Sequence, residues 1–297
     1  MENQPNNFKS GFVNIIGNPN VGKSTLLNQL VGERLAIITD KVQTTRHRIM
    51  GIVTTDDMQI VFSDTPGVLN PAYELQKKMM DFVSESLKDA DILLYVVEPG
   101  DKELVNETLN QKLQHLDIPV LLLINKIDKS NPEELNQLVE YWHGQLPKAE
   151  ILPISALKGF NVDMLLEKIK SLLPEGPKYF PEDQLTDKSE RFIVNEVIRE
   201  KILLNYQKEI PYAVEVETDR FIEEENLLRI NANIYVERDS QKGILIGHKG
   251  SALTKVGTEA REDLEKFFGK KIYLELFVRV RKDWRKKEND IRRFGYN

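Results

Sequence analysis

Residues 17–24 read Gly-Asn-Pro-Asn-Val-Gly-Lys-Ser and fit the pattern G-x-x-x-x-G-K-S. An apolar segment that predicts a strand precedes this loop and a helical pattern follows it, which is the context that the pattern requires. Such a loop turns successive backbone N–H groups and a helix N-terminus toward phosphate. We expect a lysine cation on the β- and γ-phosphates of a nucleotide and a serine hydroxyl on Mg²⁺. The loop residues assigned to nucleotide binding are Asn18, Asn20, Val21, Gly22, Lys23, Ser24 and Thr25, with Lys23 also catalytic.

A second motif, Asp64-Thr65-Pro66-Gly67, follows the apolar run 58–64. Ligands of open α/β sheets lie beyond the carboxyl ends of the strands, so this motif should face the same nucleotide. We expect Asp64 to hold Mg²⁺ through its water shell, and Thr65 and Gly67 to lie at the γ-phosphate. Gly67 can donate its backbone N–H there because no side chain intervenes, and it is assigned a catalytic role.

A third motif, Asn125-Lys126-Ile127-Asp128, ends the apolar segment 119–126. A carboxylate at Asp128 can accept both N1–H and N2–H₂ of guanine, a donor pair that adenine lacks, so the motif favours GTP and GDP over ATP. The segment Ser155-Ala156-Leu157 ends the next predicted strand and should support the base through backbone N–H. Residues assigned to the base are Asn125, Lys126, Asp128, Ser155, Ala156 and Leu157.

The polar segment 41–48 contains two adjacent threonines. We expect Thr45 to bind Mg²⁺ with Ser24 and Asp64 and to act in catalysis, with Thr44 as the less favoured choice. The four motifs, in this order, resemble the translation-factor class of GTPases. Ras-like members follow the Asp-x-x-Gly motif with a glutamine that orients water, whereas Val68 stands here. We therefore predict slow intrinsic hydrolysis, and Asn20 is a hypothetical K⁺ ligand.

Apolar strands alternate with helical patterns from residue 12 to about 173, which predicts an α/β domain with a mostly parallel six-stranded sheet. A proline-containing stretch follows, and the pattern then becomes a helix (190–205), two strands (213–218 and 227–237), a Gly-rich turn, a helix (252–268) and a strand (271–280). We predict a nucleotide domain at residues 1–178, a linker at 179–185 and a smaller α+β RNA-binding domain at 186–297.

The sequence Gly247-His248-Lys249-Gly250 lies at the start of the second of these helices. It matches the G-x-x-G loop of KH domains, which clamps about four nucleotides of RNA backbone. We expect Ile244 and Ile246 to form the floor of the groove for unstacked bases. The element order resembles the type II KH arrangement.

The chain is acidic except at its end. Residues 241–297 hold 15 Lys and Arg against 8 Asp and Glu, whereas residues 1–240 hold 26 against 39. This asymmetry indicates a polyanionic partner for the C-terminal part, although residues 279–293 could equally form a solvated helix with Trp284 packed on the domain. The absence of cysteine excludes disulfides. The polar start, residues 1–8, and the absence of a ~20-residue apolar run predict a cytoplasmic protein.

With both domains combined, the chain resembles the Era family of bacterial GTPases over nearly its whole length, on the motifs quoted above. The resemblance implies binding near the 3′ end of 16S ribosomal RNA, a role in assembly of the small (30S) subunit, GTP-dependent domain reorientation and peripheral association with the inner membrane. We expect a monomer. Two alternatives remain: an RNA chaperone whose nucleotide is structural, and a membrane-associated signalling GTPase.

Overall fold

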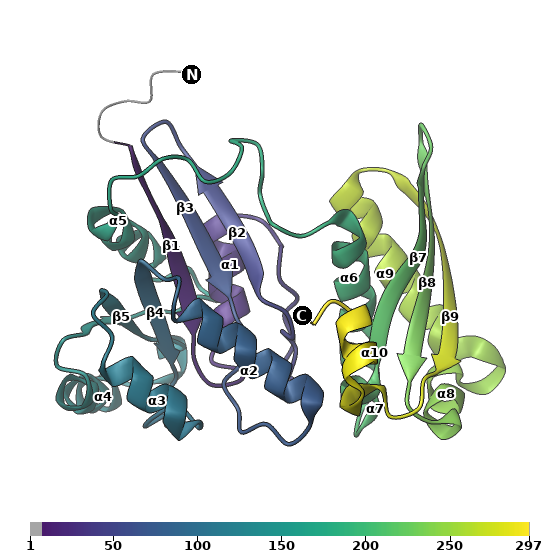
Figure 1. The fold of residues 1–297 in the computed structure, drawn as a ribbon, viewed down its shortest axis with the longest axis horizontal. Coiled ribbons are helices and arrows are strands. Elements are labelled where there is room, and N and C mark those ends of the chain that lie inside the picture. Colours follow the sequence, from purple (N-terminus) through teal and green to yellow (C-terminus); the bar gives the residue numbers. More distant parts are fainter. Residues whose placement is uncertain (1–7, 297) are drawn as a thin grey trace. The chain divides into compact units, whose positions relative to one another are not determined.

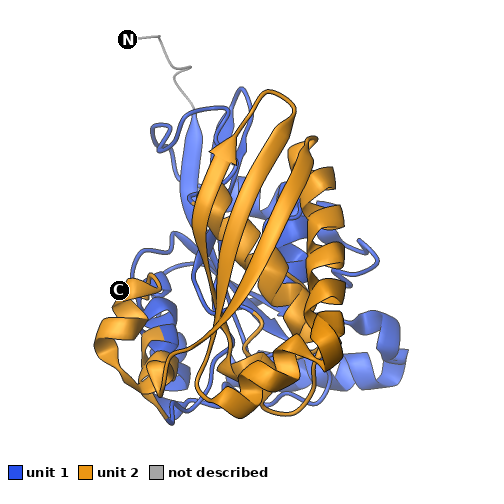
Figure 2. Ribbon diagram, turned by 90° about the vertical axis from the view of Figure 1, so that its right-hand side faces the viewer, with its two compact units in different colours: residues 1–36, 45–72, 79–187 blue, residues 37–44, 73–78, 188–297 orange. Residues whose placement is uncertain are grey.

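The computed structural model describes residues 8–296 (Figure 1). Residues 1–7 of the polar start, which contributed to the prediction of a cytoplasmic protein, and residue 297 at the end of the second predicted domain lie outside the described part. The chain divides into two compact units (Figure 2). Unit 1 comprises residues 1–36, 45–72 and 79–187, and unit 2 comprises residues 37–44, 73–78 and 188–297.

Unit 1 is built on a six-stranded sheet in the order β2-β3-β1-β4-β5-β6. Only β2 is antiparallel to its neighbour, so the predicted mostly parallel sheet is confirmed. Every residue of β3 and β4 is buried, as expected for central strands covered on both faces. The strands are β1 (Lys9–Ile16), β2 (Ile49–Thr54), β3 (Met58–Asp64), β4 (Ile92–Val97), β5 (Val120–Ile124) and β6 (Glu150–Pro153).

The helices of unit 1 connect these strands and begin at sequence-coded positions. Asn131 caps α4: its side chain accepts from the Glu134 backbone N–H at 2.9 Å, and Pro132 occupies the first turn, where its missing N–H costs nothing. Gly22 precedes α1 with a left-handed φ of 98°. The helices are α1 (Lys23–Val31), α2 (Glu74–Ser86), α3 (Glu107–Gln114), η1 (Ile127–Lys129), α4 (Pro132–Gln145) and α5 (Val162–Leu172).

The segment predicted as a linker is bound to the sheet of unit 1. The Oε1 of the buried Gln59 accepts hydrogen bonds from the backbone N–H groups of Tyr179 and Phe180, at 2.7 and 3.0 Å. The Ile52 N–H donates to the Leu185 carbonyl at 2.8 Å. Residues 179–185 therefore continue the packing of unit 1, and the compact units change at Asp187.

Unit 2 contains a three-stranded sheet, order β7-β8-β9, in which β8 and β9 run parallel. Its core combines one face of this sheet with α6 and α9. The predicted helix at 190–205 and strand at 271–280 have the expected bounds. The elements are α6 (Glu190–Asn205), α7 (Ile210–Ala213), β7 (Glu215–Glu223), β8 (Leu227–Val236), α8 (Asp239–Ile246), η2 (His248–Gly250), α9 (Ser251–Phe268), β9 (Lys271–Val280), η3 (Trp284–Lys286) and α10 (Glu288–Arg293).

The expected Gly-rich turn before α9 lies at residues 247–250, but an additional helix that was not predicted, α8, separates it from β8. The Oε1 of Gln241 accepts from the backbone N–H groups of Glu237 and Arg238, at 2.9 and 3.1 Å, which satisfies donors at the helix start. Leu245 is fully buried in the core. Burial of this side chain offsets the low helix propensity of Gly243.

Two short segments from the N-terminal half belong to unit 2. The buried Arg199 of α6 forms an ion pair with Glu196 and donates to the backbone carbonyls of Gln43 and Thr44. The Tyr73 hydroxyl donates to Gln43 Oε1 at 3.1 Å. Burial alone would favour the neutral form of Arg199, but Glu196 more than compensates and the pKa of Arg199 is raised. The charged guanidinium of Arg199 thus donates two hydrogen bonds to the backbone of segment 37–44.

The basic C-terminal run is largely structural. Trp284 is fully buried, and its Nε1–H donates to the Ala213 carbonyl at 2.9 Å. Arg281 pairs with Asp290 at 2.5 Å, and Arg285 pairs with Glu237. Of the two interpretations of this run, packing on the domain therefore accounts for these three side chains.

No helix between residues 8 and 296 combines the length and the apolar character needed to cross a membrane.

Candidate nucleotide and RNA sites

Lys23 lies inside the loop formed by residues 17–24, where its ammonium group donates to the carbonyls of Gly17 and Asn18 at 3.1 and 2.8 Å. Burial lowers its pKa to about 8, although Asp64 and Asp101 oppose this effect. A buried lysine held by two carbonyl groups is poised to exchange them for phosphate oxygens, which are better partners for a cation.

The Ser24, Thr45 and Asp64 side chains converge on one point. Asp64 Oδ2 accepts hydrogen bonds from Ser24 Oγ at 2.6 Å and Thr45 Oγ1 at 3.2 Å, and the two hydroxyl oxygens are 2.8 Å apart. No described residue hydrogen-bonds to the buried Asp64 Oδ1. Burial raises the pKa of Asp64, with Lys23 and the two hydroxyl groups acting in the opposite direction. Hard oxygen ligands around an unsatisfied carboxylate fit a divalent cation such as Mg²⁺.

Thr44 points elsewhere. Its hydroxyl bonds with the Thr39 hydroxyl and the Lys41 carbonyl, both at 2.6 Å. The geometry thus favours Thr45 over Thr44 as the threonine that joins Ser24 and Asp64.

Gly67 brings the second motif against the first loop. A Cβ at this position would lie 2.7 Å from the Pro19 Cα, so only glycine permits the approach. The next residue, Val68, donates its N–H to the Gly17 carbonyl at 3.0 Å, and its side chain is fully buried. A buried valine cannot orient a water molecule, in agreement with the absence of a glutamine after the Asp-x-x-Gly motif in the sequence.

Asn125 links the phosphate loop to the base-binding loop. Its Nδ2 donates to the Val21 carbonyl at 2.7 Å, and its Oδ1 accepts from the Ala156 N–H at 2.9 Å. A Cβ on Gly22 would come within 2.3 Å of this amide. The Ala156 N–H, expected to support the base, here supports Asn125.

Asp128 is exposed at the mouth of the site. The Ser155 hydroxyl donates to its Oδ1 at 2.5 Å and is the main cause of a lowered pKa, so the group is a carboxylate at neutral pH. Lys126, with a left-handed φ of 61°, pairs with Glu98. An ionised carboxylate oriented by a hydroxyl is suited to accept two guanine N–H groups.

Other predicted residues take supporting positions. Asn18 Nδ2 donates to Asp101 and to the Glu103 carbonyl, at 3.2 and 3.0 Å, and Thr65 Oγ1 donates to the Ile15 carbonyl at 2.7 Å. Asn20 is exposed with a left-handed φ of 67°, Thr25 is half-buried, and Leu157 is exposed. The Asn18 and Thr65 side chains thus hold the loops together.

Sequence reasoning missed Glu98 and Asp101, which lie just after β4. Glu98 pairs with Lys126, and the Asp101 carboxylate raises the pKa of Lys23 against the effect of burial. Their position past the carboxyl end of a central strand was the available signal. They were passed over because no named motif includes them.

In unit 2, the loop 247–250 joins α8 to α9 through unusual backbone conformations. Gly247 has φ 71° and ψ −177°, a region that essentially only glycine adopts. A Cβ there would lie 2.6 Å from the Ala252 Cβ. Gly250 immediately precedes α9, and His248 and Lys249 are exposed. The loop therefore presents a cation and the helix N-terminus to solvent.

The two predicted floor residues lie on α8, directly before this loop. Ile244 is half-exposed, whereas Ile246 packs partly against the core. Within residues 8–296, no three His, Asp or Glu side chains gather in a way that could hold a metal ion.

Comparison with protein families identifies both parts of the chain. Residues 12–126 match a family described as a 50S ribosome-binding GTPase, and residues 209–285 match the KH domain. The first description refers to the large ribosomal subunit and covers part of unit 1 only.

Full-length relatives extend this result. "GTPase Era" of Syntrophus aciditrophicus is 52% identical over 98% of this chain and 96% of the relative. A crystal structure of Era with MgGDPNP and nucleotides 1506–1542 of 16S ribosomal RNA superimposes with a TM-score of 0.93, at 39% identity over 97% of this chain and 99% of that one.

A variant of Aquifex aeolicus Era bound to GDP·AlF4⁻ gives the same TM-score, identity and coverage. The similarity to these relatives thus spans both units of this chain. The chain belongs to the Era family of GTPases.

Proposed function

We propose that this GTPase binds 16S ribosomal RNA near its 3′ end through the loop 247–250 and assists assembly of the small ribosomal subunit in a nucleotide-dependent manner. The observation that carries the proposal is one chain holding a guanine-selective phosphate site and an exposed KH loop. The solved relative with 16S nucleotides 1506–1542 supports this choice of RNA.

Within the nucleotide site, we assign Lys23 to the β- and γ-phosphates, Asp128 to guanine and Gly67 to the γ-phosphate. Asn18, Val21, Gly22 and Thr25 shape the phosphate loop, and Lys126, Ser155 and Leu157 border the base. Ser24, Thr45 and Asp64 would hold Mg²⁺, which neutralises phosphate charge when bound. Asp64 Oδ1, buried and without a hydrogen bond from any described residue, supports this assignment.

In the RNA site, we assign the phosphate contacts to Gly247, His248, Lys249 and Gly250. The apolar side chains of Ile244 and Ile246 would contact bases. A test compares the affinity of Lys249→Gln and wild type for a 16S 3′-end RNA. A neutral amide removes one phosphate contact, so binding should weaken. The slope of log affinity against log salt concentration should decrease in magnitude by about one.

Nucleotide control is tested by measuring RNA affinity with GDP and with a non-hydrolysable GTP analogue. Different affinities support the switch. Equal affinities would favour the alternative of an RNA chaperone with structural nucleotide. An RNA that binds the GDP and GTP forms equally well cannot shift the equilibrium between them.

Hydrolysis needs a group that Val68 does not provide, and we propose K⁺ bound near Asn20. The exposed position of Asn20 at the left-handed turn of the phosphate loop supports this assignment. Single-turnover hydrolysis should be faster in K⁺ than in Na⁺ for wild type and similar in both salts for Asn20→Ala. Equal rates for wild type would rule out the cation.

We further propose a cytoplasmic monomer that associates peripherally with the inner membrane, with a nucleotide domain at residues 1–178, a linker at 179–185 and an RNA-binding domain at 186–297. Sedimentation of a lysate before and after nuclease treatment shows whether this protein is bound to ribosomal particles or to lipid. Loss of ribosome-sized particles only after nuclease supports the RNA tether, whereas persistence in the membrane fraction favours the signalling alternative.

A further inference from the structure

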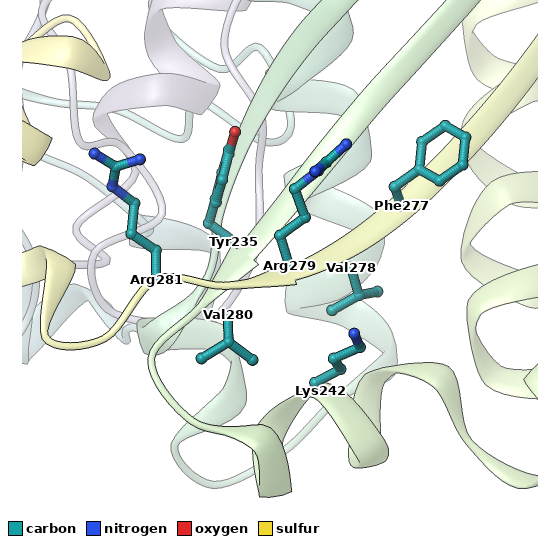
Figure 3. A pocket seen from close by; sticks show the side chains of 7 residues that line it. All are labelled: Tyr235, Lys242, Phe277, Val278, Arg279, Val280 and Arg281. Carbon is teal, nitrogen blue, oxygen red and sulfur yellow. The ribbon is translucent and has the colours of Figure 1, made fainter.

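A pocket in unit 2 collects basic side chains next to the proposed RNA site. Lys242, Arg279 and Arg281 are among the residues that line its volume of about 490 Å³ (Figure 3). Lys242 belongs to α8, which runs directly into the loop 247–250, so this pocket forms part of the surroundings of that site. A different polar cluster lies in unit 1 and is centred on Arg48, the last residue of segment 41–48.

The cluster contains two buried polar side chains on central strands. Asn14 of β1 and Ser63 of β3 are neighbours in the sheet register, and both are fully buried. Burial of an amide or a hydroxyl costs free energy unless it finds hydrogen-bond partners. Asn14 Nδ2 donates to the Ser86 carbonyl at 2.5 Å and to Asp89 Oδ1 at 2.6 Å. Ser63 Oγ accepts from Arg48 Nε–H at 2.6 Å, so distant parts of the chain meet here.

Arg48 uses all three of its guanidinium nitrogens in this cluster. Nη1 and Nη2 donate to the two carboxylate oxygens of Asp89 at 2.5 and 3.0 Å, and Nη2 also donates to Asn14 Oδ1 at 3.3 Å. The Arg48 side chain is only 11% exposed. A bidentate pair of arginine and carboxylate fixes direction as well as distance. The end of segment 41–48 is therefore fixed to the turn that follows α2.

A second contact joins the same segment to α2. The His47 ring lies against the Phe82 ring of α2, with ring centres 6.1 Å apart, which is within the range of aromatic pairs. Unit 1 resumes at Thr45 after residues 37–44, so in this unit the chain reaches Thr45 from its C-terminal side. Thr45 and Arg48 are three residues apart, which limits their Cα separation to about 11 Å. Fixing Arg48 thus restricts where Thr45 can lie.

We propose that Arg48 is a positioning residue for GTP hydrolysis. By pairing with Asp89, it keeps the Thr45 hydroxyl at the Mg²⁺ site. The inference rests on the proposed function, since it requires Thr45 to bind Mg²⁺. A buried ion pair adds little net stability compared with apolar side chains of similar volume, so the cluster acts mainly through the geometry that it imposes.

The test uses the full chain and two measurements. One is the Mg²⁺ concentration that gives half-maximal binding of a fluorescent, non-hydrolysable GTP analogue, and the other is the concentration that gives half-maximal single-turnover GTP hydrolysis. Arg48→Ala and Asp89→Ala should each raise both concentrations about tenfold, as expected for the loss of a charge-assisted pair. The double variant should be no worse than Arg48→Ala, because the two side chains act as one unit.

Arg48→Lys should not restore the wild-type values, since an ammonium group cannot form two parallel hydrogen bonds with a carboxylate. Lys168→Ala is the matched control, because it breaks an ion pair between α5 and Glu150 of β6 in the same unit. It should leave both Mg²⁺ concentrations unchanged. Thermal melting verifies that each variant is folded, and if Arg48→Ala does not fold, Asp89→Ala decides, since the Asp89 side chain is 45% exposed.

A lower melting temperature with an unchanged Mg²⁺ requirement in these variants overturns the inference, because the cluster would then only stabilise the fold. Thr45→Ala separates this outcome from failure of the proposed function. An unchanged Mg²⁺ requirement in Thr45→Ala refutes the assignment of Thr45 to Mg²⁺. A raised requirement in Thr45→Ala, with wild-type values in Arg48→Ala and Asp89→Ala, refutes only the positioning role.

Discussion

Lys23 shows how a residue's surroundings set the conditions under which it can act. Because burial lowers the pKa of Lys23 to about 8, its ammonium group is deprotonated in most nucleotide-free molecules above about pH 8. Phosphate stabilises the charged form, so affinity for GDP should fall by up to tenfold per pH unit above that value. Titration calorimetry between about pH 7.5 and 9.5 measures this dependence.

Lys23→Met is the control for that prediction. It removes the titrating group, so its weaker GDP affinity should depend less on pH, while titration of guanine itself affects both proteins. The free energy of unfolding of the nucleotide-free wild type should rise with pH, whereas its GDP affinity falls. Between about pH 8 and 10.5 the unfolded chain binds the extra proton, so the free energy of unfolding rises with pH. A parallel pH dependence of GDP affinity in wild type and variant would contradict the assignment.

Asn125 gives a second prediction at this scale. Asn125→Ala should lower the free energy of unfolding by about 2–3 kcal/mol, because the Val21 carbonyl and the Ala156 N–H lose their shared buried partner. Urea denaturation measures the change. Asn70→Ala removes an exposed side chain with one hydrogen bond, to the Val105 carbonyl, and should cost less than about 1 kcal/mol. Equal losses would show that Asn125 does not brace the two loops.

Sequence reasoning found the residues whose roles are tied to a motif, and it missed those defined by tertiary contacts. Ser24, Thr45 and Asp64 were grouped because the chemistry of Mg²⁺ demands oxygen ligands, and their side chains do contact one another, while their binding of Mg²⁺ stays a prediction. The side chain of Asn18 instead holds residues 101–105, more than 80 positions away. Such a contact leaves no local pattern in the sequence.

Among the elements, the junction of α8 and α9 depends on two glycines with different constraints. Gly247→Ala should be the more damaging change, since its Cβ would meet Ala252 at 2.6 Å and its backbone conformation is closed to alanine. At Gly250, a Cβ would meet no atom of the described residues within 4 Å, although φ is 83°. Gly250→Ala should therefore cost only about 1–2 kcal/mol of left-handed strain.

Thermal melting and RNA affinity distinguish these two variants. Gly247→Ala should melt at a lower temperature than Gly250→Ala and should lose more affinity for a tetranucleotide from the 3′ end of 16S ribosomal RNA. The reverse order would mean that the close approach of Gly247 to α9 does not determine the loop conformation.

The same junction shows where element prediction fails. The strand at 58–64 and the helix at 190–205 follow apolar patterns, and both were predicted with their observed bounds. Helix α8 has glycine at position 243 and ends at Gly247, so locally it reads as a turn. Its stability comes from the burial of Leu245 and the Gln241 cap, which depend on the folded domain.

At the scale of the whole molecule, charge is segregated along the chain, and the two ligands should respond differently to salt. RNA affinity should fall steeply between about 50 and 200 mM KCl, with a log–log slope near −0.7 for each phosphate contacted. GDP affinity should change less, because the nucleotide carries few charges and is held by directed hydrogen bonds in an acidic unit. Filter binding and calorimetry in the same buffers compare the slopes, and similar slopes would contradict a polyelectrolyte interface.

The contacts of Arg199 with Gln43 and Thr44 have a consequence for synthesis of the protein. Segment 37–44 packs with residues 188–297, which leave the translating ribosome long after it does. A nascent chain that ends at residue 187 contains segment 37–44 but not Arg199. The backbone carbonyls of Gln43 and Thr44 therefore lack the guanidinium that binds them in the finished protein. Segment 37–44 can therefore make these contacts only after Arg199 has been synthesised, so this part of unit 2 is completed by two stretches of chain that are made at different times.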